Sequence, residues 1–306
     1  MRLLVTGASG LLGGSVIQIA TNKGHDVFSA YKEHPAARGK PVPLDQTHPA
    51  EVKETISKIK PHVIINTAAQ SDVDFCEEHP DIAFAINSES VRYLATATRE
   101  AGTFLLQVST DYVFDGEKGS YLETDNPHPV NKYGLSKLEG ERATILAGEG
   151  SWSIARPSVI FGWGRPLRPN AATYVHDKLS KHETVRMVRD QYCSPTFNKN
   201  LAAMLVEIAE RQIPGILHTA GATRLSRYEL ALRIAHVFGL DKGLVIPATA
   251  EDIPWKATRP IDSSLIIERA TTLLSQKPQS IDDSLIEFCT DQKIHAGHER
   301  IVACRA

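Results

Sequence analysis

The feature that most constrains the fold of this chain is a glycine-rich turn directly after a short apolar run. Residues 3–6 read Leu-Leu-Val-Thr, and glycines follow at Gly7, Gly10 and Gly13 as a helix-patterned stretch begins. Glycines between a buried strand and a helix permit a tight turn and let backbone N–H groups approach a phosphate closely. The start of the chain is therefore typical of a dinucleotide-binding α/β unit.

Apolar runs and helix-patterned stretches then alternate along the chain. The short apolar runs lie at residues 3–6, 27–30, 63–66, 104–108 and 153–156. The helix-patterned stretches between them lie at residues 12–21, 50–60, 81–100 and 133–146. Parallel strands joined by crossover helices are buried on both faces and read as continuous apolar runs. The sequence therefore predicts an α/β fold with a Rossmann-type, doubly wound parallel sheet.

The regular alternation of apolar runs and helix-patterned stretches ends after residue 157. A loop rich in Gly and Pro follows at 162–170, and later apolar runs are fewer and less regular. Helical patterns return at 200–212 and 227–238. We predict two parts: a dinucleotide-binding domain at 1–157, joined by a later helix near 198–212, and a smaller α/β substrate-binding region at 158–306, with a loosely held tail from residue 291.

Composition excludes several classes of function. The 306 residues include 34 Lys and Arg against 36 Asp and Glu, a net charge of −2, so we expect neither nucleic acid nor an anionic membrane surface as a partner. The uncharged stretch from Leu3 to Asn22 is interrupted by Gly, Ser and Thr, which argues against a signal peptide or a membrane span. The four cysteines form no C-x-x-C pair and no zinc-type spacing, so we expect a reducing compartment, a cytoplasmic protein and no metal site.

A second group of residues has the chemistry of an acid/base site. Tyr133 and Lys137 are four residues apart, so on a helix they share one face. A nearby ammonium stabilises a phenolate, which would suit a tyrosine to proton transfer near neutral pH. Ser109, Thr110 and Asp111 follow the apolar run at 104–108, at the edge of the sheet where a substrate is expected. These five side chains are candidates for one catalytic crevice.

The residue at the end of the second strand bears on the choice of cofactor. A carboxylate that binds the ribose 2′-hydroxyl of NAD is expected about 20 residues after the glycine turn. Lys32 is near that place, and an ammonium suits a 2′-phosphate better than a free hydroxyl. NADP(H) is therefore favoured over NAD(H), although an ordinary solvated surface lysine is the alternative interpretation of Lys32.

Taken together, these motifs resemble the extended short-chain dehydrogenase/reductase superfamily. The residues that carry the resemblance are the glycine turn, the Asn-Thr-Ala-Ala segment at 66–69, the Ser-Thr-Asp segment at 109–111 and the pair Tyr133 and Lys137. Three further segments, at 109–116, 190–196 and 259–265, are similar to dTDP-4-dehydrorhamnose reductases. That family also includes the regulatory beta subunit of methionine adenosyltransferase, which acts chiefly as a binding partner.

The resemblance implies a role for each catalytic candidate. Tyr133 would protonate the carbonyl oxygen as hydride arrives, Lys137 would lower the pKa of Tyr133 and bind the nicotinamide ribose, and Thr110 would steady the developing oxyanion. Asp111 would tune Tyr133 or bond a sugar hydroxyl, and the alternative is that it only caps a turn. Dehydratases of the superfamily carry a glutamate at position 112, where this chain has Tyr112. Reduction is therefore favoured over elimination.

The resemblance also implies the binding residues. Those expected to contact the cofactor are Gly7, Ser9, Gly10, Leu11, Leu12, Gly13, Lys32, Asp45, Ala68, Ala69, Pro157 and Ser158. Those expected to contact the substrate are Ser109, Val159, Gln191 and Arg259. Val159 stands where the reductases have a tryptophan, and Asp262 stands where they have an asparagine. The carboxylate of Asp262 would repel a nucleotide phosphate unless Arg259 paired with it.

We therefore expect an NAD(P)H-dependent reductase of a nucleotide-activated 4-keto-6-deoxy sugar, most similar to the dTDP-4-dehydrorhamnose reductases of dTDP-L-rhamnose biosynthesis. One alternative is a regulatory binding subunit with little turnover, similar to the methionine adenosyltransferase beta subunit. Another is a nucleotide-sugar epimerase. A nucleotide sugar is the expected small-molecule partner, and a homodimer is left open.

Overall fold

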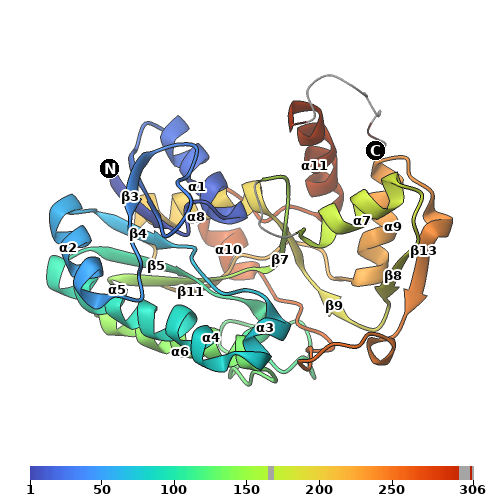
Figure 1. Cartoon of the computed structure of the whole chain (residues 1–306), viewed down its shortest axis with the longest axis horizontal. Helices are drawn as coiled ribbons and strands as arrows, with labels where there is room; N and C mark the ends of the chain where they lie inside the picture. Colours follow the sequence, from blue (N-terminus) through green and yellow to red (C-terminus); the bar gives the residue numbers. More distant parts are fainter. Residues whose placement is uncertain (165–168, 296–303, 305–306) are drawn as a thin grey trace.

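A parallel sheet of seven strands is the centre of the larger half of the molecule (Figure 1). The computed structural model describes residues 1–164, 169–295 and 304. The strands are, in sheet order, β11 (Gly215–His218), β6 (Trp152–Arg156), β5 (Phe104–Val108), β4 (Val63–Asn66), β1 (Arg2–Thr6), β2 (Asp26–Tyr31) and β3 (Lys40–Pro43). Every neighbouring pair is parallel. The predicted doubly wound sheet is confirmed.

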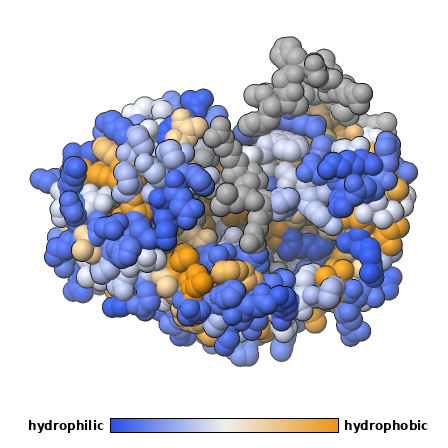
Figure 2. All heavy atoms as spheres, in the orientation of Figure 1, coloured by the Kyte–Doolittle hydropathy of each residue, from blue (hydrophilic) through white to orange (hydrophobic). Residues whose placement is uncertain are grey.

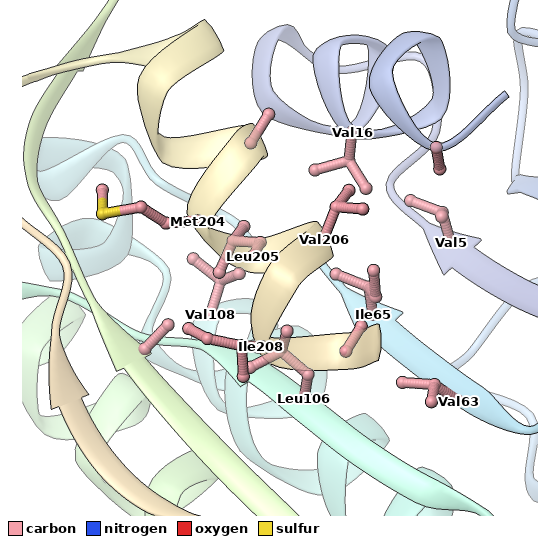
Figure 3. Close-up of a cluster of buried hydrophobic side chains, with 14 of the residues drawn as sticks. Val5, Val16, Val63, Ile65, Leu106, Val108, Met204, Leu205, Val206 and Ile208 are labelled. Atoms are coloured by element: carbon pink, nitrogen blue, oxygen red, sulfur yellow. The ribbon is translucent and has the colours of Figure 1, made fainter. Parts of the chain in front are cut away.

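Helices cover both faces of this sheet (Figure 1). Alternate residues of β1 point to opposite faces of the sheet. On one face, Leu3 and Val5 pack with α1 (Leu11–Asn22) and α8 (Asn198–Arg211). Leu4 packs on the opposite face with α2 (Pro49–Ile59) and α5 (Ser90–Ala101). Figure 3 shows Leu205, Val206 and Ile208 of α8 among the strand side chains. The later helix near 198–212 therefore packs on the dinucleotide-binding sheet, as the sequence predicts.

The smaller half has its own apolar core. It contains three short strand pairs: β7 (Ser158–Phe161) with β10 (Pro195–Phe197), β9 (Tyr192–Cys193) with β12 (Leu225–Ser226), and β8 (Val185–Val188) with β13 (Val245–Ala248). Three helices pack with them: α7 (Ala171–Ser180), α9 (Arg227–Val237) and α11 (Ile281–His295). Figure 2 shows a hollow between the two halves on a mostly hydrophilic face.

Several elements differ from the sequence-based expectation. Residues 215–218 form the edge strand β11, which lies in the region predicted to bind substrate but pairs with β6. The helix expected at 81–100 is α4 (Pro80–Phe84), a π-helical turn (Ala85–Glu89) and α5. A further helix, α3 (Val73–Glu78), precedes it, and α10 (Glu268–Leu273) lies near β11.

The described part of the C-terminal segment also differs from the expectation. Residues 291–295 continue α11, so the prediction of a loose tail from residue 291 is wrong for these residues. Cys304 forms a disulfide with Cys289 of that helix, a bond that the expected reducing compartment does not predict. Residues 296–303, 305 and 306 lie outside the described residues. None of the described helices is both long enough and apolar enough to cross a lipid bilayer.

Candidate active site

The glycine turn between β1 and α1 is built by close backbone approach. Gly7 has a φ of +66°, and a Cβ there would lie 2.7 Å from the amide nitrogen of Ala68. A Cβ on Gly13 would lie 2.2 Å from the Gly7 carbonyl oxygen, so only glycine fits this position. Gly10 is the N-cap of α1, and among the described residues no side chain caps this end. The Gly10 N–H donates to the Gly7 carbonyl oxygen at 3.0 Å, but the first N–H groups of α1 have no partner within the helix, which fits a dinucleotide pyrophosphate beside the exposed Ser9 and Gly10.

The remaining cofactor candidates surround this turn. Leu12 is buried in the core, whereas Leu11 is partly exposed and lies against Gly164. Ala68 is partly exposed and Ala69 exposed, directly after β4. Their place beside the cofactor stays a prediction.

Lys32 and Asp45 form an ion pair at the ends of β2 and β3. Their Nζ and Oδ2 atoms are 2.8 Å apart, with 63% of the Lys32 side chain exposed. Burial alone would raise the pKa of Asp45, but hydrogen bonds from Lys32 and Thr47 outweigh it and lower the pKa to about 2. Lys32 and Asp45, each predicted from the sequence to contact the cofactor, are therefore paired with each other in this structure.

The helix that carries Tyr133 and Lys137 is α6 (Lys132–Thr144), and its position is tightly fixed. Its N-cap, Asn131, accepts a hydrogen bond from the Gly134 amide at 2.8 Å. A Cβ on Gly134 would lie 2.1 Å from the Tyr112 carbonyl oxygen, and one on Gly140 would lie 2.2 Å from the Asn87 carbonyl oxygen. The helix therefore packs flush against the backbone that it faces.

Lys137 lies beneath the carboxyl end of β5. Its Nζ donates to the Val108 carbonyl oxygen at 2.7 Å, and only 3% of the residue is exposed. Burial lowers the pKa of Lys137 to about 8, against the opposing effects of Glu141 and Cys76. The amine is thus held in one place by the backbone of the strand that precedes Thr110.

Tyr133 is partly exposed and shares a hydrogen bond with the side chain of Thr110. Its ring meets the Tyr112 ring edge to face, with centroids 5.9 Å apart. Burial raises the pKa of Tyr133, and the nearby Asp111 adds to this effect. The expectation that the Tyr133 pKa is lowered is therefore wrong for the chain alone, because desolvation of the phenolate outweighs the stabilising contacts.

Asp111 is buried, and hydroxyl groups occupy both of its oxygens. Ser158 and Ser263 donate to Oδ2 at 2.7 and 2.6 Å, and Thr110 donates to Oδ1 at 3.1 Å. Burial raises the pKa of Asp111, and these three hydroxyl contacts oppose that rise. These contacts fix Asp111 next to Thr110. Ser158, expected beside the nicotinamide, is one of its donors, and Pro157 accepts from the Asp111 amide at 3.0 Å.

The residues predicted to contact the substrate differ in their surroundings. The hydroxyl of Ser109 is buried, and it has no hydrogen-bond partner among the described residues. Val159 has a φ of +37°, a strained backbone conformation for a β-branched residue. In contrast, Gln191 is buried and donates to the Pro260 carbonyl oxygen at 3.2 Å.

Arg259 does not form the pair with Asp262 that would neutralise the Asp262 carboxylate. Arg259 is 3.0 Å from Asp74 of α3, and its guanidinium lies over the Trp255 ring. Asp262 instead accepts two hydrogen bonds from Arg224, at 2.8 and 2.6 Å. The sequence could not show this pairing, because Arg224 comes from a different loop.

Two further residues act on these side chains, and neither was predicted from the sequence. Arg227, the first residue of α9, acts electrostatically on Tyr112 and Asp111. Cys76 is fully buried near Lys137, and burial raises the pKa of its thiol to about 11. Neither residue belongs to a motif near the catalytic ones, so no sequence signal placed them there. No group of metal-ligating side chains occurs in the described part of the chain.

The parallel sheet, the glycine turn and the Tyr133–Lys137 helix define an extended short-chain dehydrogenase/reductase. Within this class the chain belongs to the RmlD substrate binding domain family, whose profile matches residues 1–294. The resemblance seen in the sequence is therefore confirmed.

The similar proteins include methionine adenosyltransferase subunits and dTDP-4-dehydrorhamnose reductases. Methionine adenosyltransferase 2 subunit beta of Xenopus laevis is 35% identical over 266 residues, which cover 83% of this chain and 78% of that protein. A hypothetical dTDP-4-dehydrorhamnose reductase from Sulfolobus tokodaii has a similar structure, with a TM-score of 0.84, 39% identity and coverage of 93% of this chain and 99% of the other. The Bacillus anthracis dTDP-4-dehydrorhamnose reductase in complex with NADP gives a TM-score of 0.84, 28% identity and coverage of 95% and 99%.

Proposed function

We propose that this chain is an NAD(P)H-dependent reductase of a nucleotide-activated sugar, and specifically of a 4-keto-6-deoxy sugar such as dTDP-4-dehydrorhamnose. The observation that carries the proposal is the convergence of Tyr133, Thr110 and Lys137 at the carboxyl end of β5. The structural neighbours named as dTDP-4-dehydrorhamnose reductases support the same class of reaction.

Each of the four residues near the carboxyl end of β5 has its own role in the proposed reaction. Tyr133 donates its phenolic proton to the ketone oxygen, and its raised pKa keeps that proton in place until the oxygen becomes basic. Thr110 holds the phenol, and Asp111 fixes Thr110 from behind. Lys137, held by the Val108 carbonyl, provides the positive charge that stabilises the phenolate left after proton transfer.

The cofactor fits the residues around the glycine turn. Gly7, Gly10 and Gly13 would hold the pyrophosphate, and Lys32 and Asp45 would meet the adenosine end. When bound, the cofactor supplies the hydride that reduces the ketone carbon. We favour NADP(H) over NAD(H), because Lys32 is exposed and its ammonium can exchange Asp45 for a 2′-phosphate.

The test is turnover by a variant that lacks the phenolic hydroxyl. Tyr133→Phe should lower kcat for NADPH oxidation with dTDP-4-dehydrorhamnose by about 10²–10⁴-fold while the Kd for NADPH is unchanged. Tyr174→Phe is the matched control, since 43% of Tyr174 is exposed on α7. If Tyr133→Phe turns over as fast as the unmodified chain, the catalytic role is wrong.

A second candidate function is a regulatory binding subunit with little turnover. The identity of 35% to a methionine adenosyltransferase subunit favours this candidate, as does Val159 in a place where reductases carry a flat aromatic ring. It predicts co-purification with a methionine adenosyltransferase and no oxidation of NADPH with any keto sugar. Measurable turnover that depends on Tyr133 would exclude it as the main function.

A further inference from the structure

One carboxylate of the short helix α3 holds a loop of the predicted substrate-binding region, at residues 256–259. The Asp74 Oδ1 accepts hydrogen bonds from the backbone amides of Lys256 and Ala257, at 3.1 and 3.0 Å. The same oxygen lies 3.0 Å from the guanidinium of Arg259. Charge-assisted hydrogen bonds are stronger than neutral ones, so these three contacts fix the loop against α3.

This loop is also bonded to the N-cap residue of α6, the helix that carries Tyr133. Asn131 is buried, and its side-chain amide bridges two segments of the chain. The Asn131 Nδ2 donates to the Thr258 carbonyl oxygen, and the Oδ1 accepts from the Gly134 amide, both at 2.8 Å. A single amide group therefore joins the loop that Asp74 holds to the first turn of α6.

Helix α3 contacts the first turn of α6 directly as well. The carboxylate of Glu77 accepts a hydrogen bond from the Lys132 amide at 2.9 Å. Lys132 and Gly134 flank Tyr133, so the amides on both sides of the phenol-bearing residue are bonded to side chains, those of Glu77 and Asn131. The first N–H groups of a helix have no partner within it, and such contacts therefore decide where the turn lies.

We propose that Asp74 is a positioning residue for Tyr133: through the loop at 256–259 and Asn131, it holds the first turn of α6 where the phenol can meet the ketone oxygen. This proposal rests on the proposed function, because it assumes that Tyr133 is the proton donor. Asp74 acts here through the loop and not on the substrate. One carboxylate thereby ties the substrate-binding region to the helix that carries the donor.

The experiment compares variants of α3 by turnover of NADPH with saturating dTDP-4-dehydrorhamnose. Asp74→Ala should lower kcat about 10–100-fold, because a misplacement of about 1 Å can cost roughly 10²-fold in rate. Asp74→Asn keeps an acceptor oxygen for the two loop amides and should recover most of that loss. The Kd for NADPH should be unchanged in both variants, which also shows that they are folded.

Glu78→Gln is the matched control. Glu78 belongs to the same helix and pairs with Lys256 of the same loop, but 45% of its side chain and 58% of the lysine side chain are exposed. An exposed pair of this kind contributes little, so Glu78→Gln should leave kcat unchanged. A loss of kcat in Glu78→Gln equal to that in Asp74→Ala would overturn the specific role of Asp74.

A double-mutant cycle tests the path through Asn131. Asn131→Ser keeps a capping oxygen for α6 but removes the donor to the Thr258 carbonyl, so kcat should fall. If Asp74 acts through Asn131, the double variant Asp74→Ala with Asn131→Ser should be about as slow as the slower single variant. Losses that multiply would show that the two residues act independently, and the proposed path would be wrong.

Amide hydrogen exchange provides a measurement that needs no turnover. Asp74→Ala should speed exchange in peptides that cover the first turn of α6 by about tenfold, and Glu78→Gln should not. If Asp74→Ala does not fold, Asn131→Ser takes its place in both measurements.

Two outcomes separate this inference from the proposed function. Unchanged kcat and unchanged exchange in Asp74→Ala would refute the positioning role and leave the proposed function in place. An unmodified chain that reduces no keto sugar would overturn the proposed function, and hydrogen exchange would then decide alone whether Asp74 positions α6.

Discussion

The ion pair between Arg156 and Glu141 joins α6, the helix that carries Tyr133, to the sheet, and the effect of its removal on stability can be calculated. Glu141 follows Tyr133 and Lys137 at intervals of four residues on α6, so all three share one face. Arg156 ends β6 and donates to both Glu141 oxygens, at 2.8 and 2.6 Å. The side chains are only 2% and 4% exposed. The helix is therefore tied to the sheet by a bidentate, almost fully desolvated contact.

Glu141→Gln keeps the shape of this contact and removes its negative charge. The guanidinium of Arg156 then stays buried without a counter-charge, next to His218 at 3.5 Å and the Phe114 ring. Breaking a buried pair in this way costs about 3–5 kcal/mol, because desolvation of the remaining charge is no longer offset. At roughly 2–4 °C per kcal/mol for a chain of this size, Tm should fall by about 10 °C.

The control is Glu139→Gln on the same helix. Glu139 pairs with Arg142 at the surface, with 63% of the arginine and 34% of the glutamate side chain exposed, so its loss should cost about 0–1 kcal/mol. Urea denaturation followed by circular dichroism gives both free energies of unfolding on one scale. A loss below about 1 kcal/mol for Glu141→Gln, equal to that of the control, would refute the reasoning from burial.

Two further predictions concern lysines. The pKa of Lys137 falls from 10.5 in the unfolded chain to about 8, so between these values the unfolded state binds more protons and the free energy of unfolding rises with pH. In urea denaturation between these pH values, the free energy of unfolding of the unmodified chain should rise by about 3 kcal/mol, and Lys137→Met should abolish that rise. If the free energies of unfolding of the variant and the unmodified chain change in parallel with pH, the burial of the Lys137 charge is contradicted. Separately, Lys32→Ala should weaken NADP binding about tenfold or more and leave NAD binding unchanged, because only NADP carries the 2′-phosphate. Lys40→Ala is the control, since the Lys40 side chain is also 63% exposed and pairs with Asp26 at 2.7 Å. An equal loss of affinity for NADP and NAD in Lys32→Ala would exclude a role of Lys32 in binding the 2′-phosphate.

The fold was largely predictable because its main signals are local. The glycine turn and each buried apolar run depend on neighbouring residues, and β1, β4 and β5 appear where the pattern predicts them. β11 was not predicted, because a four-residue strand far along the chain shows its place only when it pairs with β6. The π-helical turn at Ala85–Glu89 was likewise invisible, since it interrupts a helix without a break in the apolar pattern.

The candidate site was predictable in its residues but less so in their partners. Tyr133, Lys137 and Thr110 are brought together as the motifs indicate, because helix and strand geometry decide that. Ser263, which donates to Asp111, and Asp74, which pairs with Arg259, come from segments far away in the sequence. A sequence shows which side chains carry charge, but which of them pair with each other depends on how the loops pack in the folded protein.

The contact of α6 with its neighbours through Gly134 and Gly140 has a wider consequence. At both places a carbonyl oxygen of another segment lies against the bare helix backbone, with no side chain between them to absorb a displacement. We therefore expect a shift of the backbone around Tyr112 or Asn87 to move α6, and with it Tyr133. The precision of this site is maintained by two residues that bear no functional group, so substitutions there would harm catalysis without touching any reactant.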